Sequence, residues 1–538
     1  MSKILDCRMK GYIQPFERHL ALAELSKIAK AEPSVRAGSP ELYQIAVPNK
    51  FDHNKLLAQL AYWECVRRED GKEELTTQVI RERTANVVRN GIPIAEIPAL
   101  LRKASTRSLP NRRCLRYGTH GIHEYRGKFF PQLVRSLINV AEVPAHGTVA
   151  DPMCGSGTTI VEGVLGNYRA LGLDMNPLSV FMSRTKCSLL SVSPDRLATA
   201  YEEIRASLLH PSRKQRTRML SYFSQLPAED QKYLRSWFSE QVIADLDQVA
   251  SAIRDLDDDI VRDFMTLGLS NILRRVSWQK DDDLRVRKEV RLDVDIDPVR
   301  EFLEEVGRSV RLALAFLYSR SEKRKLGHFA VSEADATDLT AVWKRWVGKI
   351  DAVITSPPYA TALPYLDTDR LSLSYLRFLS RPHHRNRDQL MIGNREISEK
   401  TRKTYWLKFQ RQRASLPTSI VQLIDTVHNL NDGTDVGFRR RNLPALLSKY
   451  FMDMEEVFRG IKTVLAPGSP AFVVVGNNHT IAGGQRTNID TPNLLCDLAE
   501  SVGLRPEGKI PMEMLVSRDI FKKNAVSSEE ILCFRNPA

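Results

Sequence analysis

Several features that would mark the chain as secreted, membrane-bound or metal-binding are missing from its sequence. Seven cysteines occur among 538 residues, and they form neither a Cys-x-x-Cys pair nor a cluster with histidine. We therefore expect reduced thiols and no metal site. No run of about 18 apolar residues is available to span a bilayer, and the N-terminus lacks the apolar core of a signal peptide. The sequence thus predicts a soluble cytoplasmic protein that does not contact membranes.

Acidic residues are in the minority. Lysine and arginine together number 79 against 65 acids, which gives a formal net charge of +14. Such an excess suits a polyanionic partner such as nucleic acid, although a basic enzyme of another kind would show the same balance. The length leaves room for one α/β domain of roughly 250 residues with substantial additions.

An acid and two glycines follow a short apolar run at residues 148–159, which read Thr-Val-Ala-Asp-Pro-Met-Cys-Gly-Ser-Gly-Thr-Thr. An apolar helical pattern begins at Thr158. This order is that of a strand, a tight turn and a helix N-terminus, the basic unit of nucleotide-binding α/β sheets. Gly155 and Gly157 allow positive φ and the close approach of a ligand. Taken alone, the pattern would also fit an unrelated α/β turn.

A second apolar run, residues 350–355, leads directly into Ser356, Pro357, Pro358 and Tyr359. Two consecutive prolines cannot continue a strand ladder, and they hold the chain extended and stiff. A hydroxyl, a rigid carbonyl and an aromatic ring are therefore presented together at the carboxyl edge of the predicted sheet. Open α/β sheets bind their ligands at that edge.

These two stretches, in this order, resemble the amino-methyltransferases that modify DNA bases at an exocyclic nitrogen with S-adenosylmethionine. The resemblance covers residues 118–185 and 328–360 by motif, and 448–535 by pattern only. It implies an α/β fold with a Rossmann-like class I methyltransferase sheet, mostly parallel with an antiparallel final strand. A helical N-terminal region and a large helical insertion complete the predicted fold class.

The resemblance also implies a set of cofactor-binding residues. The glycine turn supplies Asp151, Cys154, Gly155, Gly157 and Thr158, while Phe130 and Pro131 lie against the methionine part of S-adenosylmethionine. Asp174 ends the next strand, where a carboxylate can accept both ribose hydroxyls; its alternative role is a helix cap. Asp335 fits the adenine amino group better than Asp338. For His120 and His123 we favour loop packing or phosphate contact over catalysis.

Catalysis is assigned to Ser356, Pro357, Pro358 and Tyr359. The hydroxyl and the first proline carbonyl can accept the two amine N–H groups, and the tyrosine ring can stack on an extruded base. Serine at the first position resembles enzymes that make N4-methylcytosine, so we expect cytosine N4 as the acceptor. N6-adenine methylation, RNA guanine-N2 methylation and a non-catalytic nucleic-acid-binding protein remain alternatives.

The remaining stretches complete the predicted domain organisation. Residues 381–413 hold ten cations against three acids, interleaved with Tyr405, Trp406 and Phe409. Cations neutralise phosphates and aromatic rings stack on bases, so we expect contact with double-stranded DNA here, with residues 274–288 as the second candidate. A restriction or defence partner is a further expectation. The predicted parts are a helical N-terminal domain (1–112), the cofactor-binding half (113–190), a helical insertion (191–326), the catalytic part (327–364), a basic insertion (365–447) and the C-terminal part (448–538).

Overall fold

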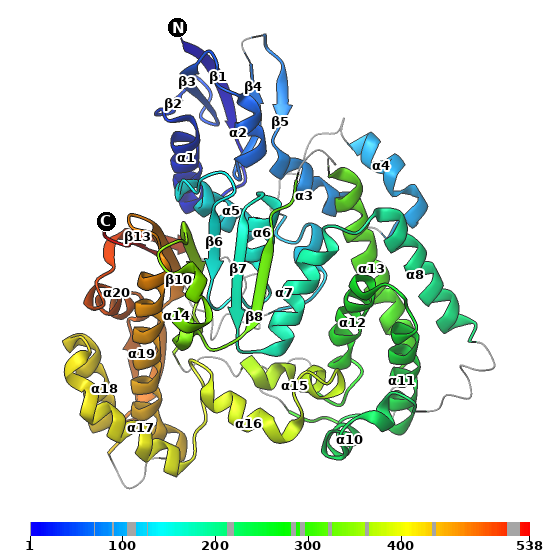
Figure 1. Ribbon diagram of the computed structural model, residues 1–538, viewed down its shortest axis with the longest axis vertical. Coiled ribbons are helices and arrows are strands. Elements are labelled where there is room, and N and C mark those ends of the chain that lie inside the picture. Colours follow the sequence, from blue (N-terminus) through cyan, green and yellow to red (C-terminus); the bar gives the residue numbers. More distant parts are fainter. Residues whose placement is uncertain are drawn as a thin grey trace.

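A computed structural model describes residues 2–68, 70–88, 91–104, 114–125, 127, 129–211, 220–280, 287–290, 296–320, 325–360, 365–432, 437–513 and 528–538. The molecule is built on a central sheet with helices on both of its faces (Figure 1). An N-terminal sheet lies at the top of this view, and helices α15 and α16 lie at the bottom, toward which strand β7 points. None of the helices described is long and apolar enough to cross a membrane.

The central sheet has seven strands in the order β13-β14-β10-β9-β6-β7-β8. Their bounds are β6 (Thr148–Asp151), β7 (Arg169–Asp174), β8 (Phe329–Glu333), β9 (Ala352–Thr355), β10 (Pro470–Gly476), β13 (Arg505–Glu513) and β14 (Ser528–Arg535). Strands β8, β7, β6, β9 and β10 are parallel, and β14 runs antiparallel between β10 and β13. The predicted Rossmann-like sheet with an antiparallel end is therefore confirmed.

The order of the chain through the sheet reverses beside β6. From β6 the chain moves outward to β7 and β8, and it then returns to place β9 on the other side of β6. After β6 and after β9 the chain therefore proceeds in opposite directions along the sheet. Such a switch point leaves a crevice in which open α/β sheets bind ligands.

Both faces of the sheet are covered, because successive side chains of a strand point to opposite faces. Val149 and Ala170 join an apolar cluster with helices α5 (Pro131–Val140) and α6 (Thr158–Leu165). Ala150 and Leu171 join a second cluster with α19 (Phe438–Val464) and α20 (Thr491–Ser501). Burial on both faces explains why these strands are continuous apolar runs in the sequence.

The prediction of a helical N-terminal domain is wrong, because residues 2–75 form a five-stranded antiparallel sheet. Its order is β2-β3-β1-β4-β5, with β1 (Ser2–Met9), β2 (Ser34–Val35), β3 (Leu42–Pro48), β4 (Trp63–Arg67) and β5 (Glu73–Leu75). Leu5, Cys7 and Met9 alternate into the core, which is the two-residue period of a strand. The accompanying helices are α1 (Pro15–Ala29), α2 (His53–Gln59), α3 (Thr77–Val87) and α4 (Ile97–Ala104).

The N-terminal sheet is also not independent of the central one. Leu20 and Trp63 belong to the same apolar cluster as Leu133 and Val149. Because the two parts share one core, residues 2–104 pack against the central sheet and do not form a separate domain. The predicted boundary near residue 112 falls outside the described residues.

Helices fill the stretch between β7 and β8. After α7 (Pro177–Leu189) come α8 (Pro194–Leu209), α10 (Ala228–Arg235), α11 (Glu240–Arg254), α12 (Asp259–Leu273) and α13 (Pro298–Ser319). Ser193, Ser239, Asp258 and Asp297 accept hydrogen bonds from the first turns of α8, α11, α12 and α13. Such capping satisfies amides that have no partner inside the helix. Leu246, Phe264 and Val306 are fully or almost fully buried where these helices pack together.

The basic insertion contains α15 (Tyr365–Tyr375), α16 (Arg381–Leu390), α17 (Glu399–Gln412) and α18 (Thr418–Leu430), and it leads into α19. Helix α19 begins at Phe438 and crosses the predicted boundary at residue 448 without a break. Pro444 lies inside it and cannot donate to the carbonyl of Arg440. That carbonyl instead accepts a hydrogen bond from Asn431 Nδ2 at 3.1 Å. The helix thus accommodates a proline in its interior.

A two-stranded hairpin follows β10 and is absent from the sequence-based expectations. It consists of β11 (Asn478–Ala482) and β12 (Gln485–Ile489). Gly483 and Gly484 form its turn with φ values of 55° and 80°. Positive φ at both central residues is what a tight hairpin turn requires. Asn431 Oδ1 accepts the Gly483 amide at 3.1 Å and so joins the hairpin to the end of α18.

Candidate active site

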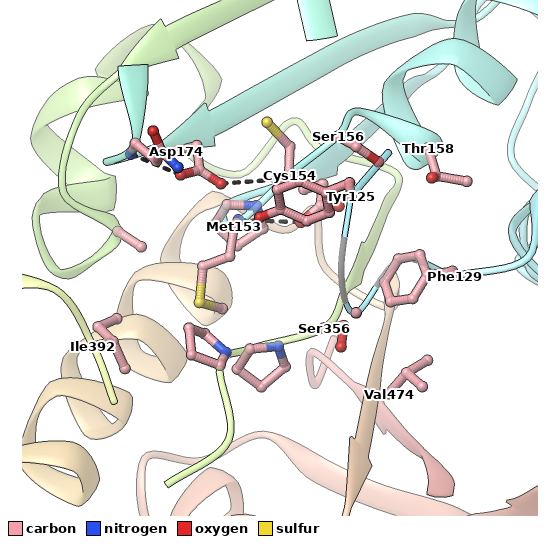
Figure 2. Close-up of a pocket in the computed structure, with 18 of the residues that line it drawn as sticks. Tyr125, Phe129, Met153, Cys154, Ser156, Thr158, Asp174, Ser356, Ile392 and Val474 are labelled. Carbon is pink, nitrogen blue, oxygen red and sulfur yellow. Dashed lines mark hydrogen bonds between the residues drawn. The ribbon is translucent and has the colours of Figure 1, made fainter. Parts of the chain in front are cut away.

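A cavity of about 420 Å³ opens at the carboxyl edge of the central sheet. It lies at the switch point, because its wall includes residues that follow β6, β7, β8 and β9. In Figure 2, Asp174 and the glycine turn lie on one side of the cavity, and Ser356, Ile392 and Val474 lie on the other. Its size falls within the range of small-molecule sites.

The glycine turn packs too closely for side chains at either glycine. Gly155 has a φ of 48°, and a Cβ there would lie 2.9 Å from the Tyr125 ring. Gly157 has a φ of 80°, and its Cβ would lie 2.6 Å from Ser183 Oγ. Cys154, Gly155 and Thr158 line the cavity, whereas Gly157 faces α7 and lies outside the wall. Gly157 therefore shapes the turn from behind.

Asp151 joins the two motifs that the sequence singled out. Its Oδ1 accepts hydrogen bonds from Thr355 Oγ1 at 2.7 Å and from the Met153 amide at 3.1 Å. Thr159 Oγ1 also donates to the Ile354 carbonyl at 3.2 Å, which ties the start of α6 to β9. Burial raises the pKa of Asp151 to about 7. Asp151 reaches the cavity wall, but its hydrogen bonds hold the ends of β6 and β9 together.

Asp174 occupies the end of β7 and orients its carboxylate with two backbone amides. Oδ2 accepts the Gly155 amide and Oδ1 accepts the Asn176 amide, each at 2.8 Å. Burial raises the pKa of this carboxyl group to about 6. A carboxylate oxygen can accept more than one hydrogen bond, so both oxygens keep acceptor capacity toward the cavity. Asp174 thus contributes an acidic side chain to the cavity wall and is not only a helix cap.

The cofactor-related residues outside the glycine turn divide into two groups. Phe130 lines the cavity, whereas Pro131 begins α5 and is buried behind the wall. Asp335 lines the cavity and accepts the Thr337 amide at 2.9 Å. Asp338 is exposed to solvent and is not among the lining residues.

The residues present fit S-adenosylmethionine. Asp174 offers carboxylate oxygens suited to a ribose diol, and Ala336 and Ile392 supply apolar surface in the same wall. Ser156 contributes a buried hydroxyl that has no hydrogen-bond partner among the described residues. Buried hydroxyls are normally paired, so a polar ligand group is expected there.

All four residues of the Ser-Pro-Pro-Tyr segment line the same cavity as Asp174 and Gly155. The Tyr359 hydroxyl donates a hydrogen bond to the Glu529 carboxylate, which sequence reasoning did not identify. Gly393 supports the segment from behind, because a Cβ there would lie 2.9 Å from the Tyr359 carbonyl oxygen. Two motifs separated by about 200 residues are therefore assembled into one site.

Sequence reasoning missed several other lining residues, namely Tyr125, Met391, Ile392, Val474, Met512 and Glu529. Val474 and Met512 lie in strands β10 and β13, and an apolar side chain in a strand carries no signal of function in the sequence. Met391 and Ile392 follow α16 and reach the cavity only through the folding of the basic insertion.

The two loop histidines pack inside the protein. His120 Nε2 lies 2.9 Å from Glu162 Oε1, and His123 Nε2 lies 3.0 Å from Ser270 Oγ. Burial alone would raise the pKa of Glu162, but the hydrogen bond with His120 and the charges of Arg81 and Arg135 lower it to about 2. Loop packing is thus the outcome for both histidines. Within the described residues no group of three or more His, Cys, Asp or Glu side chains could hold a metal ion.

A second hollow, the basic groove, has a volume of about 1,100 Å³. Its walls carry six arginines against three acids, namely Arg287, Arg381, Arg385, Arg395, Arg439 and Arg440 against Asp367, Asp388 and Glu396. Residues 388–389 line the groove and residues 391–392 line the cavity. The end of α16 therefore separates the two hollows.

The three aromatic residues of the window 381–413 pack against neighbouring helices, and of these Tyr405 and Trp406 are half-buried. Phe409 is fully buried. Trp406 packs against His428 with ring centroids 4.2 Å apart, and Tyr405 donates to the Gln389 carbonyl at 3.3 Å. Their spacing along α17 reflects its packing on neighbouring helices. In the second candidate stretch, Lys288 lies over the Trp278 ring at 4.8 Å.

Comparison with known proteins agrees with this geometry. The family described as "RMKL-like, methyltransferase domain" matches residues 123–204, which include the glycine turn and Asp174. With the sheet order and the switch-point cavity, this match makes the protein an S-adenosylmethionine-dependent methyltransferase.

The chain is similar to the Type II methyltransferase M.MvaI of Kocuria varians, with 26% identity over 379 residues, covering 67% of this chain and 77% of that protein. It is also 22% identical over 420 residues to the Type II methyltransferase M.BsoBI of Geobacillus stearothermophilus, covering 72% and 79%. Over about two thirds of its length the chain is therefore similar to S-adenosylmethionine-dependent DNA methyltransferases. Among solved structures, TrmN from Thermus thermophilus has a TM-score of 0.32 at 11% identity, covering 99% of each chain.

Proposed function

We propose that the protein transfers a methyl group from S-adenosylmethionine to the N4 amino group of cytosine in duplex DNA. The observation that carries the proposal is the position of Ser356 and Tyr359 in the same cavity as Asp174 and Gly155. The Type II names of the relatives support DNA as the substrate. They also support a restriction–modification setting, and a restriction or defence partner stays a prediction.

Asp174, Asp335, Phe130 and the glycine turn hold the cofactor in this proposal. S-adenosylmethionine supplies an electrophilic methyl group when it is bound. The Cys154 thiol is not a nucleophile here, because burial raises its pKa well above the usual range. Methylation at cytosine carbon 5, which needs a thiolate, therefore has no support from this residue.

An exocyclic amine is a poor nucleophile because its lone pair is delocalised into the base. Ser356 Oγ and the Pro357 carbonyl accept the two N–H groups, which favours a pyramidal nitrogen with its lone pair directed at the methyl group. A carbonyl held by proline is a preorganised acceptor and needs no reorganisation during the reaction. Bound S-adenosylmethionine would supply the methyl group and keep the sulfur-bonding electrons, and the amine would release one proton to solvent.

The hydroxyl of Ser356 favours cytosine. A hydroxyl can accept one N–H bond and still donate its own proton to cytosine N3. An ionised carboxylate at this position would only accept, and would face the N3 lone pair unfavourably. Adenine N1 presents a similar acceptor, so N6-methyladenine is the competing product.

The basic groove is the surface that we assign to the DNA backbone. Its arginines can neutralise phosphates, and the groove lies beside the cavity across the end of α16. The target base must leave the helix to reach the cavity, because its amine is otherwise inaccessible for in-line attack. This assignment moves the expected DNA contact from the whole window 381–413 to the arginines that line the groove, of which Arg287, Arg439 and Arg440 lie outside that window.

Nucleoside mass spectrometry of duplex DNA after reaction tests the proposal. We expect N4-methylcytosine with the wild-type protein. Ser356→Ala should keep cofactor affinity and lose on the order of 10²–10³ in rate, as when one preorganised polar partner is removed. N6-methyladenine as the sole product would refute the cytosine assignment, and full activity of Ser356→Ala would refute the role of the hydroxyl.

A further inference from the structure

A half-buried carboxylate in the wall of the candidate active-site cavity has no part in the proposed chemistry. Glu529 lies at the start of β14, opposite Gly476 of β10 and Met512 of β13. Because β14 runs antiparallel to β10, its first residues reach the same edge at which β9 ends. The topology alone therefore brings Glu529 beside the Ser-Pro-Pro-Tyr segment.

The surroundings of Glu529 are unfavourable for a charge. Val474 and Met512 line the same cavity, and burial raises the pKa of Glu529. Directly opposed residues of an antiparallel pair lie side by side on one face. Gly476, which opposes Glu529, has no side chain to occupy that space. Burying a carboxylate costs free energy unless a donor compensates, so this residue calls for a specific partner.

That partner is the Tyr359 hydroxyl, which donates to Glu529 Oε1. Tyr359 follows β9, so the bond spans the end of β10 and joins two strands that are not neighbours in the sheet. A tyrosine ring rotates about two side-chain bonds, and anchoring its hydroxyl restricts both. The bond thus fixes the plane of the ring that faces the cavity.

We propose that Glu529 is a positioning residue that acts through Tyr359, holding its ring in the plane required to stack on the extruded base. The inference rests on the proposed function, because it concerns the same base-binding site. What Tyr359 needs from residue 529 is a hydrogen-bond acceptor, and not a negative charge. This distinguishes a positioning role from that of a carboxylate that removes the amine proton.

Four variants test the proposal through kcat/KM for methyl transfer to duplex DNA and through the Kd of S-adenosylmethionine. Glu529→Leu removes the acceptor at similar size and should lower kcat/KM about tenfold to a hundredfold, within the range for leaving a buried donor without its acceptor. Glu529→Gln keeps an acceptor oxygen and should stay within about threefold of the wild type. Tyr359→Phe should resemble Glu529→Leu, and adding Glu529→Leu to it should cause no further loss.

Cofactor affinity should remain unchanged in all four, since none touches the Asp174 side of the cavity. Glu530→Gln is the matched control, because this neighbouring residue points to the opposite face of β14 and should behave as the wild type.

Each outcome either supports or refutes the positioning role of Glu529. Loss in Glu529→Gln equal to that in Glu529→Leu overturns the positioning role and makes the carboxylate a proton acceptor. Additive losses in the double variant overturn the coupling through Tyr359, and an active Glu529→Leu overturns any role. A wild type that methylates no DNA refutes the proposed function itself, and the inference falls with it. An active wild type, together with the expected losses in Glu529→Leu and Tyr359→Phe, supports both the proposed function and the positioning role of Glu529.

Discussion

Replacing Asp174 with alanine should weaken cofactor binding more than any other change in the glycine-turn half of the cavity. The carboxylate can accept both hydroxyls of a ribose while its oxygens also accept the Gly155 and Asn176 amides. Loss of such charge-assisted bonds costs about 1.5–3 kcal/mol, or roughly tenfold to 150-fold in Kd. Titration calorimetry with S-adenosylmethionine at pH 7.5 measures this loss.

The same change leaves two backbone amides without their acceptor, so the fold must be checked separately. Asp174→Ala should also lower the free energy of unfolding by about 1–3 kcal/mol. Asp174→Asn serves as the matched control, because its amide oxygen can still accept one of the two backbone N–H groups. Denaturant unfolding shows whether the alanine variant is folded under the binding conditions. Unchanged affinity in a folded Asp174→Ala protein would refute the assignment of Asp174 to the ribose.

The pH dependence of cofactor binding provides a second test of the role of Asp174. Burial raises its pKa to about 6 in the ligand-free protein. As pH falls through that value the carboxylate takes up a proton and loses acceptor capacity, so affinity should fall with it. Above pH 7 the affinity should be level. Asp174→Asn should lack this titration, and an identical pH profile in the two proteins would contradict the explanation.

Three further predictions follow from the same geometry. Asp335→Ala should weaken cofactor binding by about tenfold, the loss of one hydrogen bond, while the exposed Asp338→Ala should not, as calorimetry would show. Replacing Arg385 and Arg440 together should flatten the log–log salt dependence of DNA binding by about two units, and replacing two cations of α17 should leave the slope unchanged. Burial raises the pKa of Asp151 to about 7, so the folded state binds this proton more tightly than the unfolded state does. Between pH 4 and 7 the wild type should therefore lose stability relative to Asp151→Asn as pH rises, by on the order of 1 kcal/mol per pH unit, in denaturant unfolding.

The sequence by itself determined the elements of the proposed cofactor site. Asp151, Gly155 and Asp174 were recognisable because each stands at the end of an apolar run, followed by residues that end a strand. Parallel strands bring their carboxyl ends to one edge, so recognising the strands was enough to predict that these residues meet. The closing antiparallel pair was recognisable for the same reason, because β13 and β14 carry strand patterns of their own.

Local sequence patterns gave wrong predictions where a short helix and a short strand follow each other closely in the chain. The pattern of residues 51–67 predicts one amphipathic helix, but the chain forms α2, a short connection and then β4. The pairing of β4 with β1 decides this, and no window of neighbouring residues contains that information. Likewise Trp406 and Phe409 looked like a base-stacking surface, whereas their contacts with His428 and the core give them a structural role.

Only the tertiary structure decided which residues complete the catalytic cavity. Glu529 lies 170 positions after Tyr359, and their contact follows from the pairing of β14 with β10. Ile392 reaches the wall because the basic insertion folds back beneath the sheet edge. A glutamate at the start of a strand and an isoleucine after a helix carry no local signal of function. Their roles arise from long-range packing, which depends on the summed burial of the whole chain and not on any single stretch of it.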